Sequence, residues 1–129
     1  MTEGSGPTPE GTAGLREDPI ANIARADGSI VVTLAGELDL YNAAVVREAL
    51  LECCGEAPER LIVDLSEVKF IDSTALGVLI EARTRMANRR SFLLASPGLE
   101  TRRALEISGL DRHFAVHDTV DAARAAPVS

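Results

Sequence analysis

Aromatic residues are scarce in this sequence: they make up 3% of its 129 residues, and tryptophan is absent. Surfaces that stack nucleic-acid bases on ring side chains need several such residues, so the composition argues against that kind of surface. Basic residues are also in the minority, with 13 against 20 acidic ones, and the formal net charge is −7. Because binding to a phosphate backbone depends on basic patches, we expect no nucleic-acid partner.

Long apolar runs are absent as well, since none approaches the ~20 residues that span a bilayer. The N-terminus lacks the charged and apolar regions of a signal peptide. Cysteine is limited to the adjacent pair Cys53 and Cys54, which forms neither a disulfide framework nor a C-x-x-C motif. These absences predict a cytoplasmic protein with free thiols that pack at a helix end, and no membrane contact.

Sequence signatures of catalysis and of cofactor binding are missing too. The phosphate-cradling G-x-x-x-x-G-K-S/T motif, the G-x-G-x-x-G motif and the G-x-S-x-G motif do not occur. His113 and His117 are four residues apart and would share one face of a strand, but two ligands do not make a metal site. We therefore expect no cofactor, no metal and no enzymatic activity, with a nucleotide-binding or hydrolytic enzyme kept as an alternative.

Composition divides the chain into three parts. Residues 1–19 are rich in Gly, Pro, Thr, Ser and Glu, which predicts a disordered tail. Residues 20–125 predict one domain, because hydrophobic residues at 46% of the chain suffice for a single core. Residues 126–129 are expected to fray as a C-terminal tail.

Hydrophobic periodicity and turn residues predict alternating strands and helices within that domain. Asp27-Gly28 separates two β-rich runs and is a strong hairpin signal, and Gly36 is expected to end the second strand. The expected strands cover 20–26, 29–34, 61–65, 91–95 and 113–117, and the expected helices cover 41–54, 74–88, 101–108 and 119–124. Strands that alternate with helices after a hairpin indicate an α/β domain with a mixed sheet.

The stretch 61–80 joins a buried strand to an amphipathic helix. Three residues of helix-capping type, Asp72, Ser73 and Thr74, stand between them. Ser73 is therefore expected at the mouth of the helix, where backbone N–H groups lack intrahelical partners. Because such a helix end is a natural anion site, we interpret Ser73 as a phosphorylation switch and the helix behind it as a docking element.

Each of the first two helices predicts one buried face. The expected core positions are Val45, Val46, Ala49, Leu50 and Cys53 in the first helix, and Ala75, Val78, Leu79, Ala82 and Met86 in the second. Leu76 and Ile80 lie on the flank of the second helix, beside Gly77. They belong either to an exposed docking patch or to a contact beneath a neighbouring helix, and periodicity alone leaves both interpretations open.

Three landmarks resemble one known family. Residues 70–77, which read Phe-Ile-Asp-Ser-Thr-Ala-Leu-Gly, resemble the signature of the STAS-domain anti-sigma factor antagonists. Gly36-Glu37-Leu38-Asp39 and Ser108-Gly109-Leu110 resemble its other two landmarks, in matching order and spacing. Ala75 departs from the glycine that many members carry. The resemblance covers residues 20–125 and implies a single α/β domain, with a four- to five-stranded mixed sheet and helices packed mainly on one face.

The resemblance also implies a mechanism. Ser73 would be phosphorylated by a partner that is both an anti-sigma factor and a serine kinase, and a phosphoserine phosphatase would reverse the modification. The unphosphorylated form would bind the anti-sigma factor and free a sigma factor, with Asp39 beside Ser73 at the binding surface. The expected partner-binding residues are Asp39, Asp72, Thr74, Leu76, Gly77 and Ile80. A STAS scaffold module in a stress-signalling or lipid-transport assembly, without dynamic phosphorylation, remains the alternative.

Overall fold

A β-hairpin forms one edge of the sheet. In the computed structural model, which describes residues 18–128, strand β2 (Ile20–Ala26) pairs antiparallel with β3 (Ser29–Leu38). The turn residues Asp27 and Gly28 have φ values of 54° and 81°. Two consecutive residues with positive φ are typical of the tight hairpin turn that matches the twist of the strands. The hairpin predicted at Asp27-Gly28 is confirmed.

The rest of the sheet is parallel. Strands β4 (Arg60–Ile71), β5 (Phe92–Ala95) and β6 (Ala115–His117) follow β3 in the order β2-β3-β4-β5-β6, each parallel to its neighbour. Because the hairpin partner β2 alone runs antiparallel, the five strands of the described residues form a mixed sheet, as the sequence predicts. The carboxyl ends of β3 and β4 consequently lie at the same edge of the sheet.

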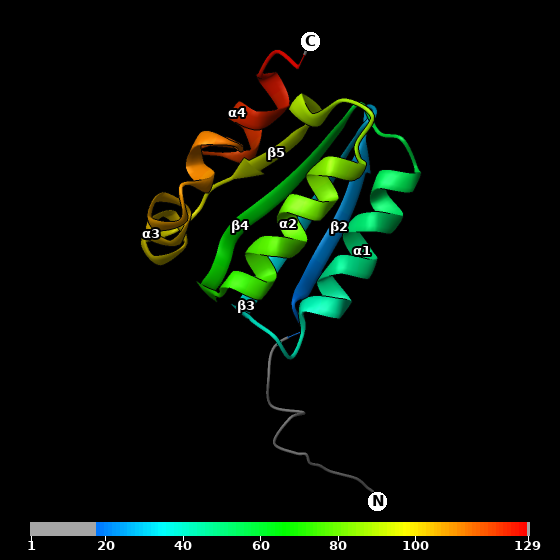
Figure 1. The fold of residues 1–129 in the computed structure, drawn as a ribbon. Coiled ribbons are helices and arrows are strands. Elements are labelled where there is room, and N and C mark those ends of the chain that lie inside the picture. Colours follow the sequence, from blue (N-terminus) through cyan, green and yellow to red (C-terminus); the bar gives the residue numbers. More distant parts are fainter. Residues whose placement is uncertain (1–17, 129) are drawn as a thin grey trace, which may run out of the picture.

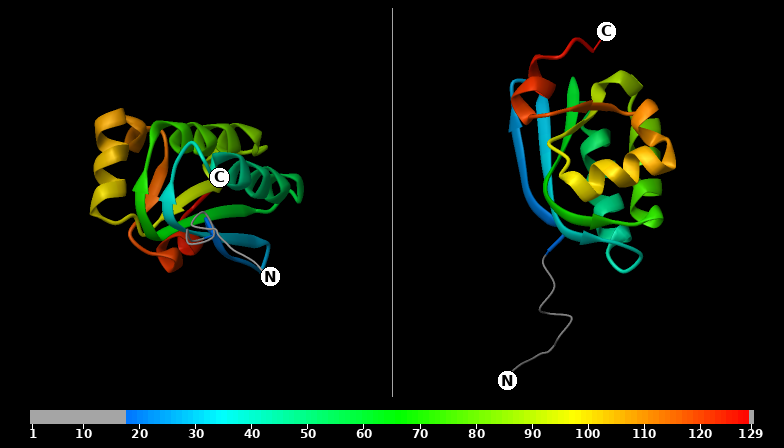
Figure 2. Two further views of the ribbon diagram at one scale, coloured as in Figure 1. Left: turned by 90° about the horizontal axis from the view of Figure 1, so that it is seen from below. Right: turned by 90° about the vertical axis from the view of Figure 1, so that its left-hand side faces the viewer.

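Four α-helices and two short 3-10 helices complete the described part of the chain. They are α1 (Ala43–Gly55), α2 (Ser73–Arg85), η3 (Arg89–Ser91), α3 (Leu99–Ser108), η4 (Leu110–Arg112) and α4 (Val120–Ala125). Helices α1, α2 and α3 cover one face of the sheet, and α4 lies on the other (Figures 1 and 2). The predicted fold, with helices mainly on one face, is confirmed. None of these helices is long and apolar enough to cross a membrane.

Alternation along the strands separates two apolar clusters. Val32 and Val63 are buried with the apolar side chains of α1, α2 and α3, whereas Val31 and Ile62 pack with Ala123 of α4. Successive residues of a strand point to opposite faces, so the β-branched runs of β3 and β4 supply both clusters. The sheet therefore has a large core on one face and a smaller one on the other.

Two strands are longer than the sequence predicts. Strand β3 continues past Gly36 to Leu38, because Gly36 takes a φ of 78° and the register shifts at that point without ending the pairing. Strand β4 continues to Ile71, although Ser66 and Glu67 interrupt its apolar pattern. A second register shift in the β3–β4 pairing lies opposite this interruption. Irregular strand positions of this kind break the alternation that sequence analysis relies on.

One further expectation needs correction. Val45 was expected in the core, but its side chain is 50% exposed, and Ala43 is buried on that face of α1 instead. Near the C-terminal end, Val128 packs against the α4 cluster, and its carbonyl accepts a hydrogen bond from the Asn88 side chain at 2.7 Å. At the other end, most of the expected tail lies outside the described residues, and the Pro19 carbonyl accepts a hydrogen bond from Ala35.

Candidate functional site

The candidate site forms where β3 and β4 end side by side. Leu38 and Ile71, the last residues of the two strands, are partners in the parallel ladder. The next residue of each segment is an aspartate, and the Asp72 backbone N–H donates to the Leu38 carbonyl at 3.0 Å. The pairing therefore forms a junction between the segments that begin at Asp39 and Asp72, although these segments are far apart in the sequence.

Asp72 holds this junction with both carboxylate oxygens. One oxygen accepts a hydrogen bond from Ala75 in the first turn of α2 at 3.0 Å. The other accepts from the Leu40 backbone N–H at 3.1 Å. With its extended backbone (φ −100°, ψ 178°), Asp72 is the N-cap of α2 and also fixes the loop that follows β3.

Ser73 is the first residue of α2, and its side chain is exposed. The predicted position at the helix mouth is confirmed. The Asp72 carboxylate accepts a hydrogen bond from the N–H of Ala75. The N–H groups of Ser73 and Thr74 have no acceptor within the helix, because they lie in its first turn. Thr74 is exposed beside it. Ser73 is therefore accessible from solvent without any opening of the fold.

Asp39 is fixed by the loop that it begins. Its carboxylate accepts a hydrogen bond from the Tyr41 N–H at 3.0 Å, and its own N–H donates to the Asn42 side chain at 2.9 Å. The Asn42 amide group also donates to the Glu37 carbonyl at 2.8 Å. Since Leu40 is bonded to Asp72, this loop lies directly beside the start of α2. Sequence analysis missed Asn42, whose role depends on a loop conformation that no motif specifies.

Large exposed apolar side chains surround this junction, and sequence analysis missed them. Leu40 is 66% exposed and Tyr41 is 83% exposed in the loop after Asp39. Phe70, which pairs with Glu37 across the β3–β4 ladder, is 49% exposed. In the sequence, the Leu-Tyr pair directly after a strand was the signal that could have indicated this apolar surface. The aspartates and Ser73 thus share one end of the sheet with apolar groups suited to contact another protein.

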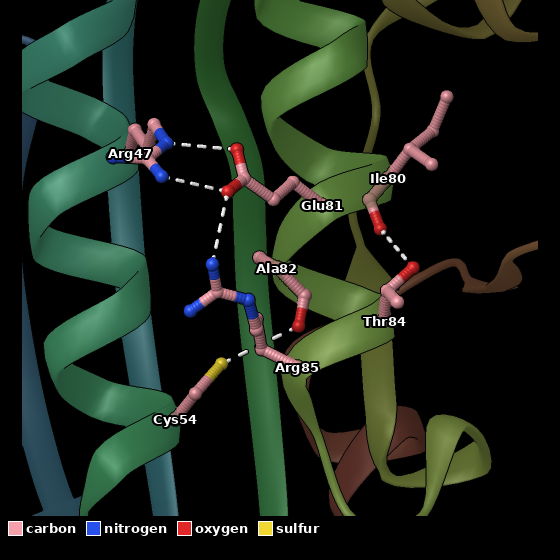
Figure 3. A network of polar contacts seen from close by, with 7 residues as sticks. All are labelled: Arg47, Cys54, Ile80, Glu81, Ala82, Thr84 and Arg85. Atoms are coloured by element: carbon pink, nitrogen blue, oxygen red, sulfur yellow. Dashed lines mark hydrogen bonds and ion pairs between the residues drawn. The ribbon is translucent and has the colours of Figure 1, made fainter.

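The flank of α2 divides between core and surface. Leu76 is 7% exposed and belongs to the main core cluster, so of the two interpretations left open for it the buried contact is correct and the exposed patch is not. Ile80 is 43% exposed and projects from the side of α2 that faces away from α1 (Figure 3). Gly77 is exposed, and a side chain added there would meet no atom within 4 Å. The five positions predicted as the core face of α2, from Ala75 to Met86, are all buried.

The remaining candidate residues lie away from this junction. His113 follows η4 and His117 ends β6, so they do not share a strand as expected. Among residues 18–128, no three His, Cys, Asp or Glu side chains gather as a metal site would require. Burial raises the pKa of both the Cys53 and Cys54 thiols, and the Cys54 sulfur donates to the Ala82 carbonyl at 3.4 Å. The thiols are packing groups between α1 and α2, as predicted.

Known proteins resemble this chain over most of its length. The sequence pattern of the STAS domain matches residues 21–123. Anti-sigma-F factor antagonist RsfB of Mycobacterium tuberculosis is 33% identical over 98 residues, or 76% of this chain and 80% of the relative. The anti-sigma-B factor antagonist of Listeria monocytogenes is 41% identical over 83 residues, or 63% of this chain and 72% of the relative. An anti-sigma factor antagonist from Mycobacterium paratuberculosis has a crystal structure with a TM-score of 0.75 at 30% identity, covering 80% of this chain and 88% of that one.

Proposed function

Because the chain belongs to the STAS domain family, we propose that it is an anti-sigma factor antagonist that acts by partner switching. In its unphosphorylated form it binds an anti-sigma factor that has serine-kinase activity, and the sigma factor held by that protein is released. Phosphorylation of Ser73 ends the binding, and a phosphoserine phosphatase restores it. The chain is a substrate and a binding partner in this scheme, and it catalyses no step itself. The names of its relatives support the regulatory role.

The observation that carries the proposal is the position of Ser73. An exposed hydroxyl at the first residue of a helix is accessible to a kinase, and the helix end tolerates the phosphate that results. Hydroxyl and phosphate are therefore both compatible with the same fold. A modification at this point changes the surface of the domain without disturbing its core.

The charge of the site gives the direction of the switch. A phosphate group adds about −1.5 to −2 charges at neutral pH. The Asp72 and Asp39 carboxylates already make the junction acidic, and the loop between them brings Leu40 and Tyr41 to the same surface. A partner that covers these apolar groups must also desolvate the phosphate, which costs several kcal/mol unless new cations pair with it. Phosphorylation therefore weakens the complex.

The proposed binding surface has an acidic centre and an apolar border. Asp72 and Thr74 flank Ser73 in the chain, and the loop that begins at Asp39 is bonded to Asp72 through Leu40. Gly77 and Ile80 extend the proposed surface along α2. Gly77 leaves the helix backbone open to close approach by a partner. Leu76 supports this surface from beneath as a core residue.

The proposal is tested with the kinase itself. Pull-down with Ser73→Ala, which keeps the binding surface and cannot be phosphorylated, captures the partner, and the purified partner is then incubated with ATP and each variant. We expect phosphate transfer to wild type and to the control Thr74→Ala, but none to Ser73→Ala. Calorimetry should show that Ser73→Ala binds the anti-sigma factor, whereas Ser73→Glu and the phosphorylated protein lose most of the affinity.

Two results would contradict the proposal. If the phosphorylated protein binds the anti-sigma factor as tightly as the unmodified protein, the switch does not exist. If a captured partner transfers no phosphate to any variant, the chain functions as a STAS scaffold without dynamic phosphorylation. Phosphatase, esterase and ATPase assays on the purified chain should give background rates, and activity that Ser73→Ala or Asp39→Ala removes would identify an enzyme instead.

A further inference from the structure

A cavity lined by basic side chains lies at the end of α2 opposite to Ser73. Its volume is 280 Å³, and its walls come from α2, η3, β5, β6, the segment after η4 and the residues that follow α4. Arg83, Arg89, Arg90, His113 and His117 all line it. Arg83 follows Ser73 by ten residues on α2, which corresponds to about 15 Å along the helix axis. The cavity is therefore separate from the proposed phosphorylation site.

The arrangement of charge in this cavity differs from the rest of the molecule. Three arginines and two histidines converge there, and no carboxylate is found among the described residues that line it. Elsewhere in the described chain, arginines pair with carboxylates, as in Arg25–Glu56 or Arg102–Asp118.

Two of the three arginines of the cavity lack such a carboxylate partner within the described chain. Neither Arg83 nor Arg89 has a carboxylate partner among residues 18–128, whereas Arg90 has an interaction of its own. In a chain with a net charge of −7, two arginines that line one cavity without a local acid form a site that favours an anion.

A second, apolar cavity adjoins the basic one. It has a volume of 220 Å³ and is lined by Ile80, Leu110 and Phe114. Arg83 and His113 line both cavities, so these two side chains lie between the two spaces. A ligand that lies across them would present an anionic group to the arginines and an apolar group to the side chains between α2 and η4.

We propose that this pair of cavities binds a small phosphate monoester with an apolar organic group. The planar guanidinium groups of Arg83 and Arg89 present paired N–H donors that match phosphate oxygens, and histidine nitrogens donate further hydrogen bonds. Each volume is small compared with the ~300–1,000 Å³ of typical pockets for larger ligands, so the two parts fit a compact molecule. A ligand bound at this site would add a small-molecule signal to the proposed regulatory role. The proposal for the site does not depend on that role.

Calorimetric titration of the full chain with phenyl phosphate and with inorganic phosphate, in phosphate-free buffer at low ionic strength, tests the site. We expect one binding site, with phenyl phosphate about tenfold tighter than inorganic phosphate because its ring enters the apolar cavity. Arg83→Gln and Arg89→Gln should each weaken both ligands about tenfold. Ile80→Ala should weaken phenyl phosphate alone. Arg112→Gln is the matched control, since this exposed arginine lies on η4 and lines neither cavity.

Several outcomes would overturn the proposal. It fails if wild type shows no saturable binding of phenyl phosphate, or if Arg83→Gln and Arg89→Gln bind it as wild type does. It also fails if Arg112→Gln weakens binding as much as they do, because the effect would then be one of general charge. Loss of binding in Ser73→Glu would place the anion at the other end of α2. No partner protein is needed for these titrations, so their result is independent of the proposed function.

Discussion

Asp72 is the residue on which the geometry of the candidate site depends most. Its two carboxylate oxygens accept hydrogen bonds from Ala75 in α2 and from Leu40 in the loop after β3. One side chain therefore positions both the helix that begins with Ser73 and the loop that begins with Asp39. A substitution of Asp72 therefore alters these two hydrogen bonds as well as the charge of the site.

Substitution of Asp72 by alanine should lower the free energy of unfolding by about 1–2 kcal/mol, because the N-cap and the bond to Leu40 are both lost. Asp72→Asn is the matched control, since asparagine is a good N-cap residue and should retain most of the stability. Urea unfolding of the three proteins measures the differences. Amide exchange at Leu40 should increase in both variants, because asparagine has a single acceptor oxygen and cannot accept from Ala75 and Leu40 together. Equal losses of stability in the two variants would show that the charge or the bond to Leu40, and not the cap, is what matters.

Leu76 and Ile80 are one turn apart on α2 and should respond in opposite ways to the same substitution. Leu76→Asp places a carboxylate in the core and should cost more than about 3 kcal/mol of stability. Ile80→Asp changes an exposed side chain and should cost less than about 1 kcal/mol while weakening the binding of the anti-sigma factor. Thermal melting and calorimetry on both variants give the result. If Ile80→Asp unfolds, Ile80 does not belong to a binding surface.

The sequence predicted the site residues whose structure is local. Ser73 could be placed at the start of a helix because capping chemistry depends only on its immediate neighbours. Leu76 could not be placed, since its burial depends on which elements pack against the flank of α2. Leu40 and Asn42 were missed for two different reasons. The Leu40 hydrogen bond to Asp72 exists only once β3 and β4 have paired, whereas the bonds of Asn42 depend on the conformation of the loop after β3.

At the scale of elements, a polar link joins α1 to α2. Arg47 of α1 donates two hydrogen bonds of 2.8 Å to the Glu81 carboxylate, and Arg85 of α2 lies 3.5 Å from the same group (Figure 3). The hydrogen bond from Arg47 lowers the pKa of Glu81 below its ordinary value of 4.5. The Arg47 and Glu81 side chains are 46% and 33% exposed, so solvent screens the link, and it orients two helices that the core already holds.

Glu81→Gln should therefore lower the melting temperature by a few degrees at most at neutral pH. A depressed carboxyl pKa contributes stability that is fully present above about pH 4.5 and is lost as the pH falls through the lowered pKa. The difference between wild type and Glu81→Gln should consequently disappear at pH 2 to 3 and shrink in ~1 M salt. Thermal melts of both proteins across pH and salt measure it. A difference that persists at low pH would mean that packing, and not charge, is affected.

The order of elements was predictable, and their ends were less so. The sequence predicted the five strands and four α-helices of the described residues in the correct order, but it did not predict the 3-10 helices η3 and η4. Hairpin and capping signals mark most of the predicted boundaries. The prediction ended β3 at Gly36 and β4 at residue 65, where irregular pairing interrupts the alternation. Beyond these irregular positions, the strands extend because they pair with each other. The apolar pattern of one strand alone does not reveal this pairing.

At the scale of the whole molecule, Pro19 lies directly before the first described strand and is buried. The Pro19 carbonyl accepts a hydrogen bond from Ala35 at 3.0 Å. Deletion of residues 1–17 should leave the melting temperature nearly unchanged, because that stretch has almost no apolar side chains to bury. Deletion of residues 1–19 should lower it by a few degrees. A drop of more than a few degrees on the shorter deletion would show that residues 1–17 pack on the domain.

The two faces of the sheet are covered unequally, and this makes the C-terminus important. Three helices cover one face, whereas α4 covers the other, and it has only six residues (Figure 2). Ala123 of α4 is fully buried, and Val128 extends the same apolar cluster beyond the end of the helix. A helix this short gains little stability from its own hydrogen bonds. Contacts made after it should therefore hold it on the sheet.

Val128→Asp should accordingly lower the free energy of unfolding by about 1–2 kcal/mol, because a partly buried apolar contact is replaced by a carboxylate. Ile107→Asp is the matched control: Ile107 is 87% exposed on α3, so the same change there should stay within about 0.5 kcal/mol. Urea unfolding compares the two variants, and amide exchange within α4 should increase only in Val128→Asp. Equal stability of the two variants would mean that the C-terminal residues fray and that α4 alone closes the second face of the sheet.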